Sequence, residues 1–325
     1  MANRRHPCRS HRGVALITAM LVVAIAATLG TAMALNSDIW LRSATNAKDR
    51  TQAEAIRIGA QHFAAWALRK DARESKTDDL SEAWAQPQTL PIDNGVGVIS
   101  VQLVDAQGRF NLNNLVKNDQ PEIPYAGMFR RLLELEKVSP DLVEAAIDWI
   151  DANSQAQPNG AEDIDYLGLN TPYRSANRPF ESVGELRLVR GFNAEIVERL
   201  SPYLTALPAG TTVNLNTAPA TVLAAMFPDL STDTISQAIA GREKKPIASL
   251  SEFMQLLPSG TPQPQVATSV TSTYFYLNVD TRIGRVQYRS TSLLMRPNGD
   301  GPAAILWNAP PPIQLKRDDK RNDHT

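Results

Sequence analysis

Residues 12–35, RGVALITAMLVVAIAATLGTAMAL, place an arginine and a glycine directly before an apolar stretch that carries no charge. A helix of about twenty apolar residues spans the hydrocarbon core of a bilayer. Basic residues in front of such a segment stay in the cytoplasm, and this one is preceded by Arg4, Arg5, Arg9 and Arg12. We therefore expect residues 14–35 to cross the membrane once, with the rest of the chain on the far side.

The position of Gly13 differs from that of the cleavage site in an ordinary secretory signal, which follows the apolar region. Cleavage after Gly13 would leave the hydrophobic helix on a mature chain that begins at Val14. This arrangement resembles the leader of type IV pilin-like proteins, in which a prepilin peptidase cuts after the glycine and the new amino terminus is methylated. The alternative is a plain single-span anchor.

Thr18 would be the fifth residue of the mature chain, where most members of the pilin-like group have a glutamate. The resemblance implies that this carboxylate pairs with the amino terminus of a neighbouring subunit. A carboxylate in an apolar layer is costly without such a partner, and a subunit with no neighbour ahead of it does not need one. Thr18 therefore predicts a chain at the end of a filament, unless the pairing simply varies within the group.

The composition is that of a mostly folded protein, with 43% hydrophobic residues in 325 and a net charge of −1. A charge near zero gives no overall attraction for nucleic acid or anionic lipid, and residues 115–270 carry an excess of carboxylates. Cys8 is the one cysteine. Because it precedes the expected cleavage site, the mature chain would contain no disulfide.

The chain beyond the apolar segment continues a helical pattern without proline to Arg69, with Ile56, Ala60, Phe63 and Ala67 on one face. One long helix over residues 14–71 is the simplest interpretation. Its first half would lie in lipid or in a filament core. Its second half would pack an aromatic face, Phe63 and Trp66, on a sheet.

Two separated parts of the sequence have the alternation of a β-sheet. Residues 95–105 alternate valines and leucine before Asp105-Ala106-Gln107-Gly108, which predicts a strand and a tight turn, with another strand from Arg109. Residues 273–296 predict a hairpin around Gly284. The sheet is thus expected to be split by a long helical insertion.

The insertion contains several segments with helical periodicity, many of which begin at Ser, Asp, Asn or Thr caps. Residues 185–200 and 214–241 resemble helix-hairpin-helix units, which often bind DNA through glycine-rich hairpins. Here the first hairpin has only Gly191 followed by Phe192, and the second has no glycine but adds Asp229. The preferred interpretation is therefore a packed helical core.

A long loop between Asp148 and Glu181 is rich in carboxylates, with Asp148 and Asp151 at a helix end and further acidic residues after Gly160. Calcium takes six to eight oxygen ligands, and a flexible loop can wrap them around the ion. No His or Cys lies nearby, which argues against zinc, and the spacing is not that of an EF-hand. The alternative is an acidic loop that is simply solvated.

The histidines argue against an enzyme. His6 and His11 lie in the leader, His62 on the long helix and His324 in the tail. None is placed for a buried Ser-His-Asp or Cys-His arrangement, and Cys8 would be removed. We expect an assembly component without catalytic residues.

Residues 12–29, 105–115, 148–153, 159–192 and 213–226 together resemble the minor pseudopilin K family of type II secretion systems, over nearly the whole chain from Arg12 to Met295. The resemblance implies an α+β fold in which a long N-terminal helix packs on a small antiparallel sheet. A large all-α domain of helix-hairpin-helix or SAM-like units is inserted in that sheet. The expected divisions are a leader (1–13), the helix (14–71), the first sheet part (72–114), the insertion (115–270), the second sheet part (271–297) and a disordered tail (298–325).

The resemblance also implies bound structural calcium in the helical domain, for which the candidate ligands are Asp151, Glu162, Asp163, Asp165 and Asn177. It implies a place at the tip of the periplasmic pseudopilus, beside the minor pseudopilins I and J and below an outer-membrane secretin. The prepilin peptidase, other pseudopilins, the inner membrane and exported proteins are the remaining expected partners. The rival interpretations are a membrane-anchored helix-hairpin-helix protein that binds DNA and a membrane-anchored hydrolase that uses the acidic loop and a metal.

Overall fold

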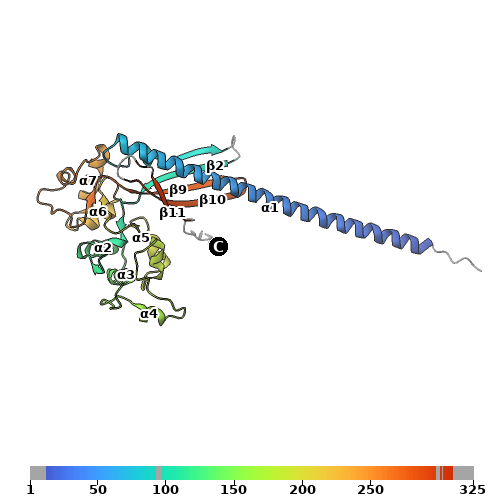
Figure 1. The fold of residues 1–325 in the computed structure, drawn as a ribbon, viewed down its shortest axis with the longest axis horizontal. Helices are drawn as coiled ribbons and strands as arrows, with labels where there is room; N and C mark the ends of the chain where they lie inside the picture. The colour runs from blue at the N-terminus through green and yellow to red at the C-terminus, as the bar shows by residue number, and fades with distance from the viewer. Residues whose placement is uncertain (1–11, 93–96, 298–300, 302, 310–325) are drawn as a thin grey trace, which may run out of the picture.

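The computed structural model describes residues 12–92, 97–297, 301 and 303–309. Helix α1, Arg12–Glu74, is a single rod of 63 residues, and its first half projects far beyond the rest of the molecule (Figure 1). The apolar segment at its start is long enough to cross a membrane and is exposed. Residues 1–11, which hold most of the predicted leader, lie outside the described part of the chain.

The second half of α1 packs on the sheet through small and aliphatic residues. Ala60, Ala64 and Leu68 are at most 9% exposed and contact the apolar face of the strands. The prediction that Phe63 and Trp66 lie on this face is wrong, because their side chains are 61% and 56% exposed. Alanine lets the helix backbone approach the sheet closely, so the large rings fit on the opposite side of the helix.

The sheet is antiparallel, with the strand order β1-β2-β9-β10-β11. The predicted hairpin is confirmed: β9 and β10 turn at Gly284, whose φ of 53° requires a residue that tolerates the left-handed region. Two of the strands, β1 and β11, have no counterpart in the sequence predictions. The strands are β1 Gln88–Ile92, β2 Gly97–Asp105, β9 Tyr274–Ile283, β10 Val286–Met295 and β11 Ala304–Ala309.

Strand β11 corrects the expectation of a disordered tail from residue 298. Leu293 of β10 pairs with Trp307, and the Trp307 ring lies 6.0 Å from that of Tyr276. The sequence before this strand, PNGDG at residues 297–301, has the composition of a loop. For this reason the sequence does not predict the short strand that follows. Residues 310–325 lie outside the described part.

The turn after β2 also differs from the prediction. The chain does not return as a second strand of the sheet from Arg109. Instead β3, Phe110–Asn111, pairs in parallel with β6, Leu204–Thr205, inside the helical domain. Asp105 is 4% exposed and accepts hydrogen bonds from across the domain junction, so the turn directs the chain away from the sheet.

The insertion between β2 and β9 consists of short helices around a continuous apolar core. Figure 1 shows these helices gathered around the far end of α1, away from its projecting half. The α-helices are α2 Ile123–Leu135, α3 Leu142–Ile150, α4 Asp163–Leu167, α5 Ala194–Leu200, α6 Ala220–Met226, α7 Thr232–Lys244 and α8 Leu250–Gln255. The 3-10 helices are η1 Ala83–Ala85, η3 Leu112–Asn114 and η4 Val183–Leu188, and the remaining two-residue strands are β4 Val116–Lys117, β5 Gln120–Pro121, β7 Val213–Asn214 and β8 Thr268–Ser269.

The helical domain uses one local arrangement twice. Asn113 donates through Nδ2 to the carbonyl of Phe180 at 2.9 Å and accepts from its N–H at 2.7 Å. Asn216 makes the same pair of bonds with Ile247, both at 3.0 Å. Both asparagines follow an Asn-Leu pair, and both partners stand in a Pro-x-x-Ser segment that begins a helix. The domain is therefore built from two similar units.

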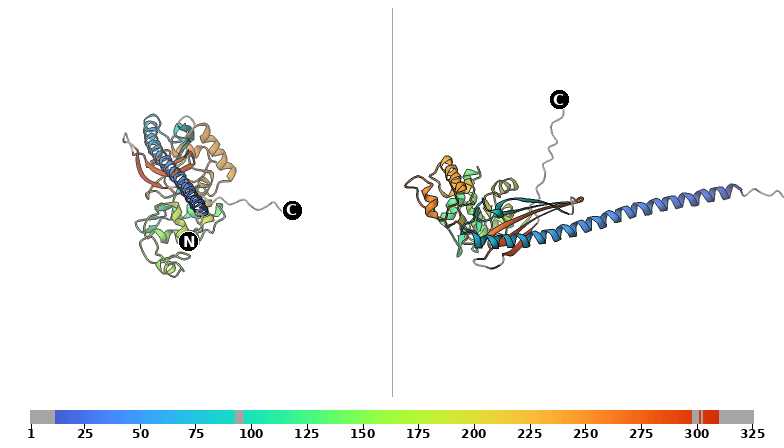
Figure 2. Two further views of the ribbon diagram at one scale, coloured as in Figure 1. Left: turned by 90° about the vertical axis from the view of Figure 1, so that its right-hand side faces the viewer. Right: turned by 90° about the horizontal axis from the view of Figure 1, so that it is seen from above.

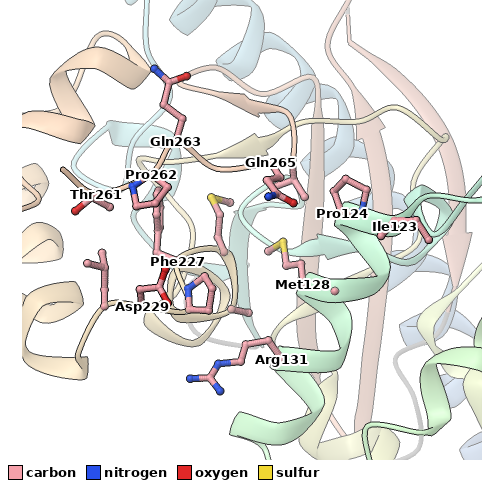
Figure 3. Close-up of a pocket in the computed structure, with 16 residues that line it drawn as sticks. Ile123, Pro124, Met128, Arg131, Phe227, Asp229, Thr261, Pro262, Gln263 and Gln265 are labelled. Carbon is pink, nitrogen blue, oxygen red and sulfur yellow. The ribbon is translucent and has the colours of Figure 1, made fainter.

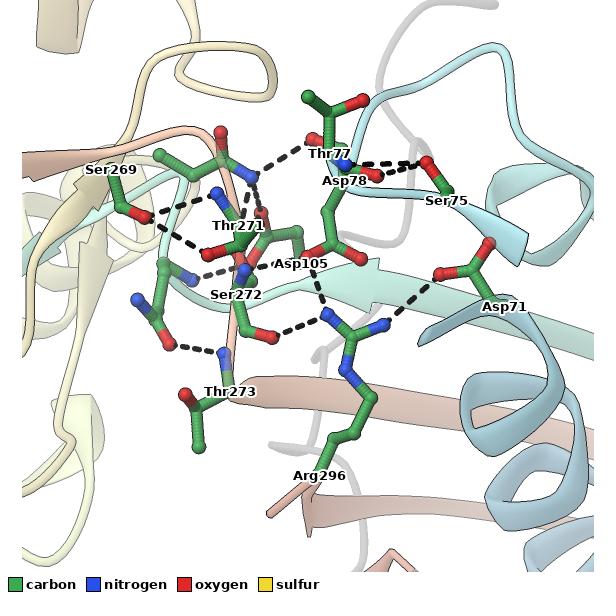
Figure 4. A network of polar contacts seen from close by, with 12 residues as sticks. Asp71, Ser75, Thr77, Asp78, Asp105, Ser269, Thr271, Ser272, Thr273 and Arg296 are labelled. Carbon is green, nitrogen blue, oxygen red and sulfur yellow. Dashed lines mark hydrogen bonds and ion pairs between the residues drawn. The ribbon is translucent and has the colours of Figure 1, made fainter. Parts of the chain in front are cut away.

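A buried arginine joins the end of α1 to the helical domain. Arg296 donates to Asp71 at 3.0 Å, to Asp78 and to the carbonyl of Ser272 at 2.7 Å (Figure 4). Asp105 accepts from Asn214, Thr217 and Ser272 in the same region. Buried polar groups that are fully hydrogen-bonded fix a unique geometry, so this network holds the helical domain in one orientation on the sheet.

Candidate functional site

The loop between α3 and η4 brings carboxylates from separate elements together. Asp148 lies in the last turn of α3, and Asp151 follows that helix as its C-cap. Glu162 is the N-cap of α4. Asn177 has a φ of 47°, and its N–H donates to the carbonyl of Trp149 at 3.1 Å, which holds this part of the loop against the end of α3.

Four oxygens in this cluster have no hydrogen-bond partner: Asp148 Oδ1, Asp151 Oδ1, Glu162 Oε1 and Asn177 Oδ1. The three acidic residues are at most 3% exposed. No salt bridge within the described residues reaches any of these carboxylates. Buried carboxylates are normally paired or coordinate a metal, so the oxygens of this cluster fit a cation.

Burial, together with the neighbouring carboxylates, also changes the pKa values of the cluster. Burial, and then the charges of Asp148 and Asp151, raise the pKa of Glu162 to about 7. Burial, and then Asp148 and Asp119, raise the pKa of Asp151 to about 6. Burial also raises the pKa of Asp148. The carboxylates therefore repel one another, which a bound cation would relieve.

A glycine lets the loop pass closely over Asp148. A Cβ on Gly160 would collide with the Asp148 carboxylate, and the N–H of Gln157 donates to Asp148 Oδ2 at 3.1 Å. One oxygen of Asp148 is thus held by the backbone while the other is left without a partner. The loop is shaped around this carboxylate.

The other two predicted ligands have different roles. Asp163 accepts from the N–H and hydroxyl of Ser175 and from Arg174, at 2.9 to 3.1 Å. Asp165 accepts from the N–H of Glu162 at 3.0 Å and from Arg190 at 3.2 Å. All four oxygens of this pair already have partners, so the cluster consists of Asp151, Glu162 and Asn177 from the predicted set, with Asp148 added.

Asp71, Asp78 and Glu82 form a second group, in which oxygens of the three carboxylates lie within 4.8 Å of one another. Here a cation is already present, because Arg296 pairs with both aspartates. Glu82 accepts from Trp84 Nε1 at 2.7 Å. This group belongs to the junction between α1 and the helical domain.

A pocket of about 440 Å³ lies between α2, the end of α6 and the loop before β8 (Figure 3). Met128 and Phe227 line it, with Arg131 and Asp229 also at its wall. Its lining residues include no histidine, cysteine or lysine, so they do not form a nucleophile–base pair of the usual kinds. His62, on α1, is exposed.

The helix-hairpin-helix segments are part of the packed core. Gly191 has a φ of 86°, and a Cβ there would collide with Leu142 of α3. This glycine therefore lets the turn between η4 and α5 lie against Leu142 of α3. The arrangement supports the interpretation of these segments as core elements.

The exposed surface of α1 is the other candidate functional feature. The Thr18 hydroxyl donates to the carbonyls of Val14 at 3.1 Å and Ala15 at 3.0 Å, so it is satisfied within the helix. Phe63 and Trp66 contact each other on the outer side, with ring centroids 5.6 Å apart. The helix presents apolar surface both in its projecting half and beside the sheet.

A long, initially apolar helix packed on an antiparallel sheet defines a pilin-like α+β protein. Models of the family described as type II secretion system protein K match residues 108–209 and 213–273, which correspond to the two similar units of the helical domain. The chain is 34% identical to the type II secretion system protein K of Pseudomonas aeruginosa, over 92% of each chain. It is 33% identical to that of Klebsiella pneumoniae, over 88% of this chain and 92% of the relative.

A solved structure, the GspK-GspI-GspJ complex of the type 2 secretion system from enterotoxigenic Escherichia coli, contains a similar chain. The TM-score is 0.71 at 26% identity, and the match covers 81% of this chain and 97% of that one. The chain belongs to the type II secretion system protein K family. It is a minor pseudopilin, and the comparisons support this function over the DNA-binding alternative.

Proposed function

We propose that this minor pseudopilin is a non-enzymatic subunit at the tip of the pseudopilus, where it joins the minor pseudopilins I and J, initiates the filament and caps it. It is anchored in the inner membrane by one span, with the rest of the chain in the periplasm. The observation that carries the proposal is the unpartnered apolar surface of α1 below a wide helical domain. The similar solved chain is part of a GspK-GspI-GspJ complex.

The helical domain supports the capping role by its position. Seen from the end where α1 begins, this domain spreads well beyond the outline of the helix (Figure 2, left). The Arg296 network fixes it to the end of α1. A further subunit above this one would have to pack its helix where the helical domain lies, so the filament would grow from below.

The outer aromatic side of α1 is the expected contact with a partner helix. Phe63 and Trp66 are exposed, and Lys70 lies over the Trp66 ring at 5.8 Å from its centroid. Exposed aromatic clusters mark interaction sites, and tryptophan often dominates binding energy at interfaces. This surface lies on the same helix as the apolar membrane segment, so a partner helix that contacts the segment lies close to it.

The test is co-purification of I and J with the full chain from membranes. We expect the double variant Phe63→Ala, Trp66→Ala to retain at least tenfold less of the two partners, because truncation of a central aromatic side chain typically costs about 2 kcal/mol or more. Ile164→Ala, on the exposed face of α4, is the matched control and should retain them. Unchanged recovery with the double variant would remove this surface from the proposal.

We also propose that the acidic cluster holds structural calcium, through Asp148, Asp151, Glu162 and Asn177. Carboxylate and amide oxygens are the ligands that calcium prefers, and the four unpaired oxygens are of these types. The ion would supply the missing positive charge and join the end of α3, the start of α4 and the loop at Asn177. The chain's own hydrogen bonds already orient each of these segments.

Asp151→Asn separates this proposal from a solvated acidic loop. In chelator at pH 7.5 we expect the variant to be as stable as the unmodified chain or more stable, because one repelling charge is gone. Calcium at about 100 times its Kd should stabilise the unmodified chain by about 2.7 kcal/mol and the variant far less. Thermal unfolding measures both, with Glu181→Gln from the exposed part of the loop as control. An equal calcium effect in all three chains would exclude the site.

A further inference from the structure

A groove separates the helical domain from the free edge of the sheet. Trp149, Tyr173 and Phe180 line it on the helical side, and Leu306, Trp307 and Ala309 line it on the side of β11. Its volume is about 1160 Å³. Most of its wall is apolar, and Leu188 and Leu306 are 46% and 45% exposed. An apolar surface of this kind marks a binding site.

The chain itself reaches the rim of this groove. Ala309 ends β11, pairs with Thr291 and lines the groove. Strand β10 extends further, to Val286, and its residues 286–290 have no partner on the β11 side within the described residues. The next three residues are Pro310, Pro311 and Pro312, which have no N–H to donate to a ladder. The sequence after Ala309 is therefore poorly suited to continue the strand along β10.

We propose that residues 310–315 of the same chain, PPPIQL, occupy this groove. Consecutive prolines favour the polyproline II conformation, and grooves lined by aromatic side chains bind such segments. Trp307, Tyr173 and Trp149 supply the aromatic wall. Ile313 and Leu315 are apolar residues that the groove would cover.

The length and composition of residues 310–315 suit the groove. Six residues in polyproline II conformation extend about 19 Å, at about 3.1 Å per residue. From Lys316 the sequence KRDDKRNDHT is entirely polar, so the apolar part ends at Leu315. Because the segment is tethered at the rim, its local concentration is high, and it needs little affinity to fill the groove. The domain would then be joined to the sheet along this side as well as through Arg296.

The experiment measures protection of the groove in the full chain. In a Cys8→Ser background, Leu188→Cys places the one thiol in the groove wall, and its rate of reaction with a maleimide reports exposure. We expect the reaction to be at least fivefold slower in the full chain than in a chain that ends at Ala309. The full-length variant Ile313→Asp, Leu315→Asp should react as fast as the shortened chain, which avoids relying on truncation alone.

Thr89→Cys, on β1 at the opposite edge of the sheet, is the matched control and should react at one rate in all three backgrounds. Equal rates for Leu188→Cys in the full and shortened chains would overturn the proposal. Protection that disappears on dilution of the protein would also overturn it, because the groove would then hold the segment of a second copy.

Discussion

Four oxygens without hydrogen-bond partners make up the proposed calcium site. Asp151, Glu162 and Asn177 could be named from the sequence because carboxylates and amides crowd one loop. The sequence marks Asp148 only as the border of that loop. Asp148 is three residues before Asp151 at the end of α3, and residues three apart lie on one side of a helix. This spacing is the feature of the sequence that indicates that the two carboxylates lie together.

The sequence does not separate these proposed ligands from Asp163 and Asp165. All four carboxylates between residues 151 and 165 look alike in composition. Only the fold shows that Asp163 is held by Ser175 and Arg174 and that Asp165 caps α4 and pairs with Arg190. Long-range partners of this kind depend on where the loop folds back.

The raised pKa values predict a pH-dependent calcium effect. The pKa values of Asp151 and Glu162 are about 6 and about 7 in the folded chain, above their ordinary values of 3.8 and 4.5. Without calcium the folded state keeps protons that the unfolded state has lost, so this cluster makes stability fall as the pH rises from about 4 to 7. Calcium needs the deprotonated groups, so its stabilising effect should grow over pH 6 to 7.

Unfolding measured with calcium and with chelator from pH 5 to pH 8 tests this prediction. The difference between the two curves isolates the cluster from Asp71, whose pKa of about 7 has burial as its largest cause. A calcium effect of the same size at pH 5 and pH 8 would contradict the assignment.

At the scale of elements, periodicity located α1, the β9–β10 hairpin and most helices, because their apolar residues recur at regular intervals. It misassigned the buried side of α1. Alanines at positions 60 and 64 fit against the sheet, while the more hydrophobic Phe63 and Trp66 face outward. In a subunit of an assembly, large exposed rings belong to an interface, and periodicity does not distinguish a core from an interface.

The two strands that were not predicted, β1 and β11, lie at the edges of the sheet. Strand β1 contains Pro91 and is mostly exposed, and β11 is short and follows a loop-like sequence. Edge strands have one neighbour, so their pattern of burial is weak. Their pairing depends on the central strands.

The repeated asparagine arrangement predicts large effects on stability. Asn216→Ala would leave the buried N–H and carbonyl of Ile247 without their partner, at about 1–3 kcal/mol for each group. Asn113→Ala should have the same effect through Phe180. Denaturant unfolding measures the loss, with the exposed Gln102→Ala as control. If either asparagine variant kept the full free energy of unfolding, the equivalence of the two units in the fold would be lost.

At the scale of the whole molecule, the resemblance carried by several separate motifs predicted the α+β architecture and the inserted helical domain. The orientation of that domain could not be predicted. It rests on Arg296, Asp78 and Asp105, which come from distant parts of the sequence and meet only at the junction. In the proposed filament, the same junction places the helical domain where a further subunit would have to pack its helix.

The proposed role at the filament tip requires a mature chain whose apolar helix forms its amino terminus and joins it to neighbouring subunits. Mass spectrometry of the protein isolated from membranes tests this most directly. We predict an amino-terminal peptide that begins at Val14 and carries a methyl group on its amino nitrogen. A protein that retains Arg12 and Gly13, or that begins beyond Leu35, would contradict the proposed role at the filament tip.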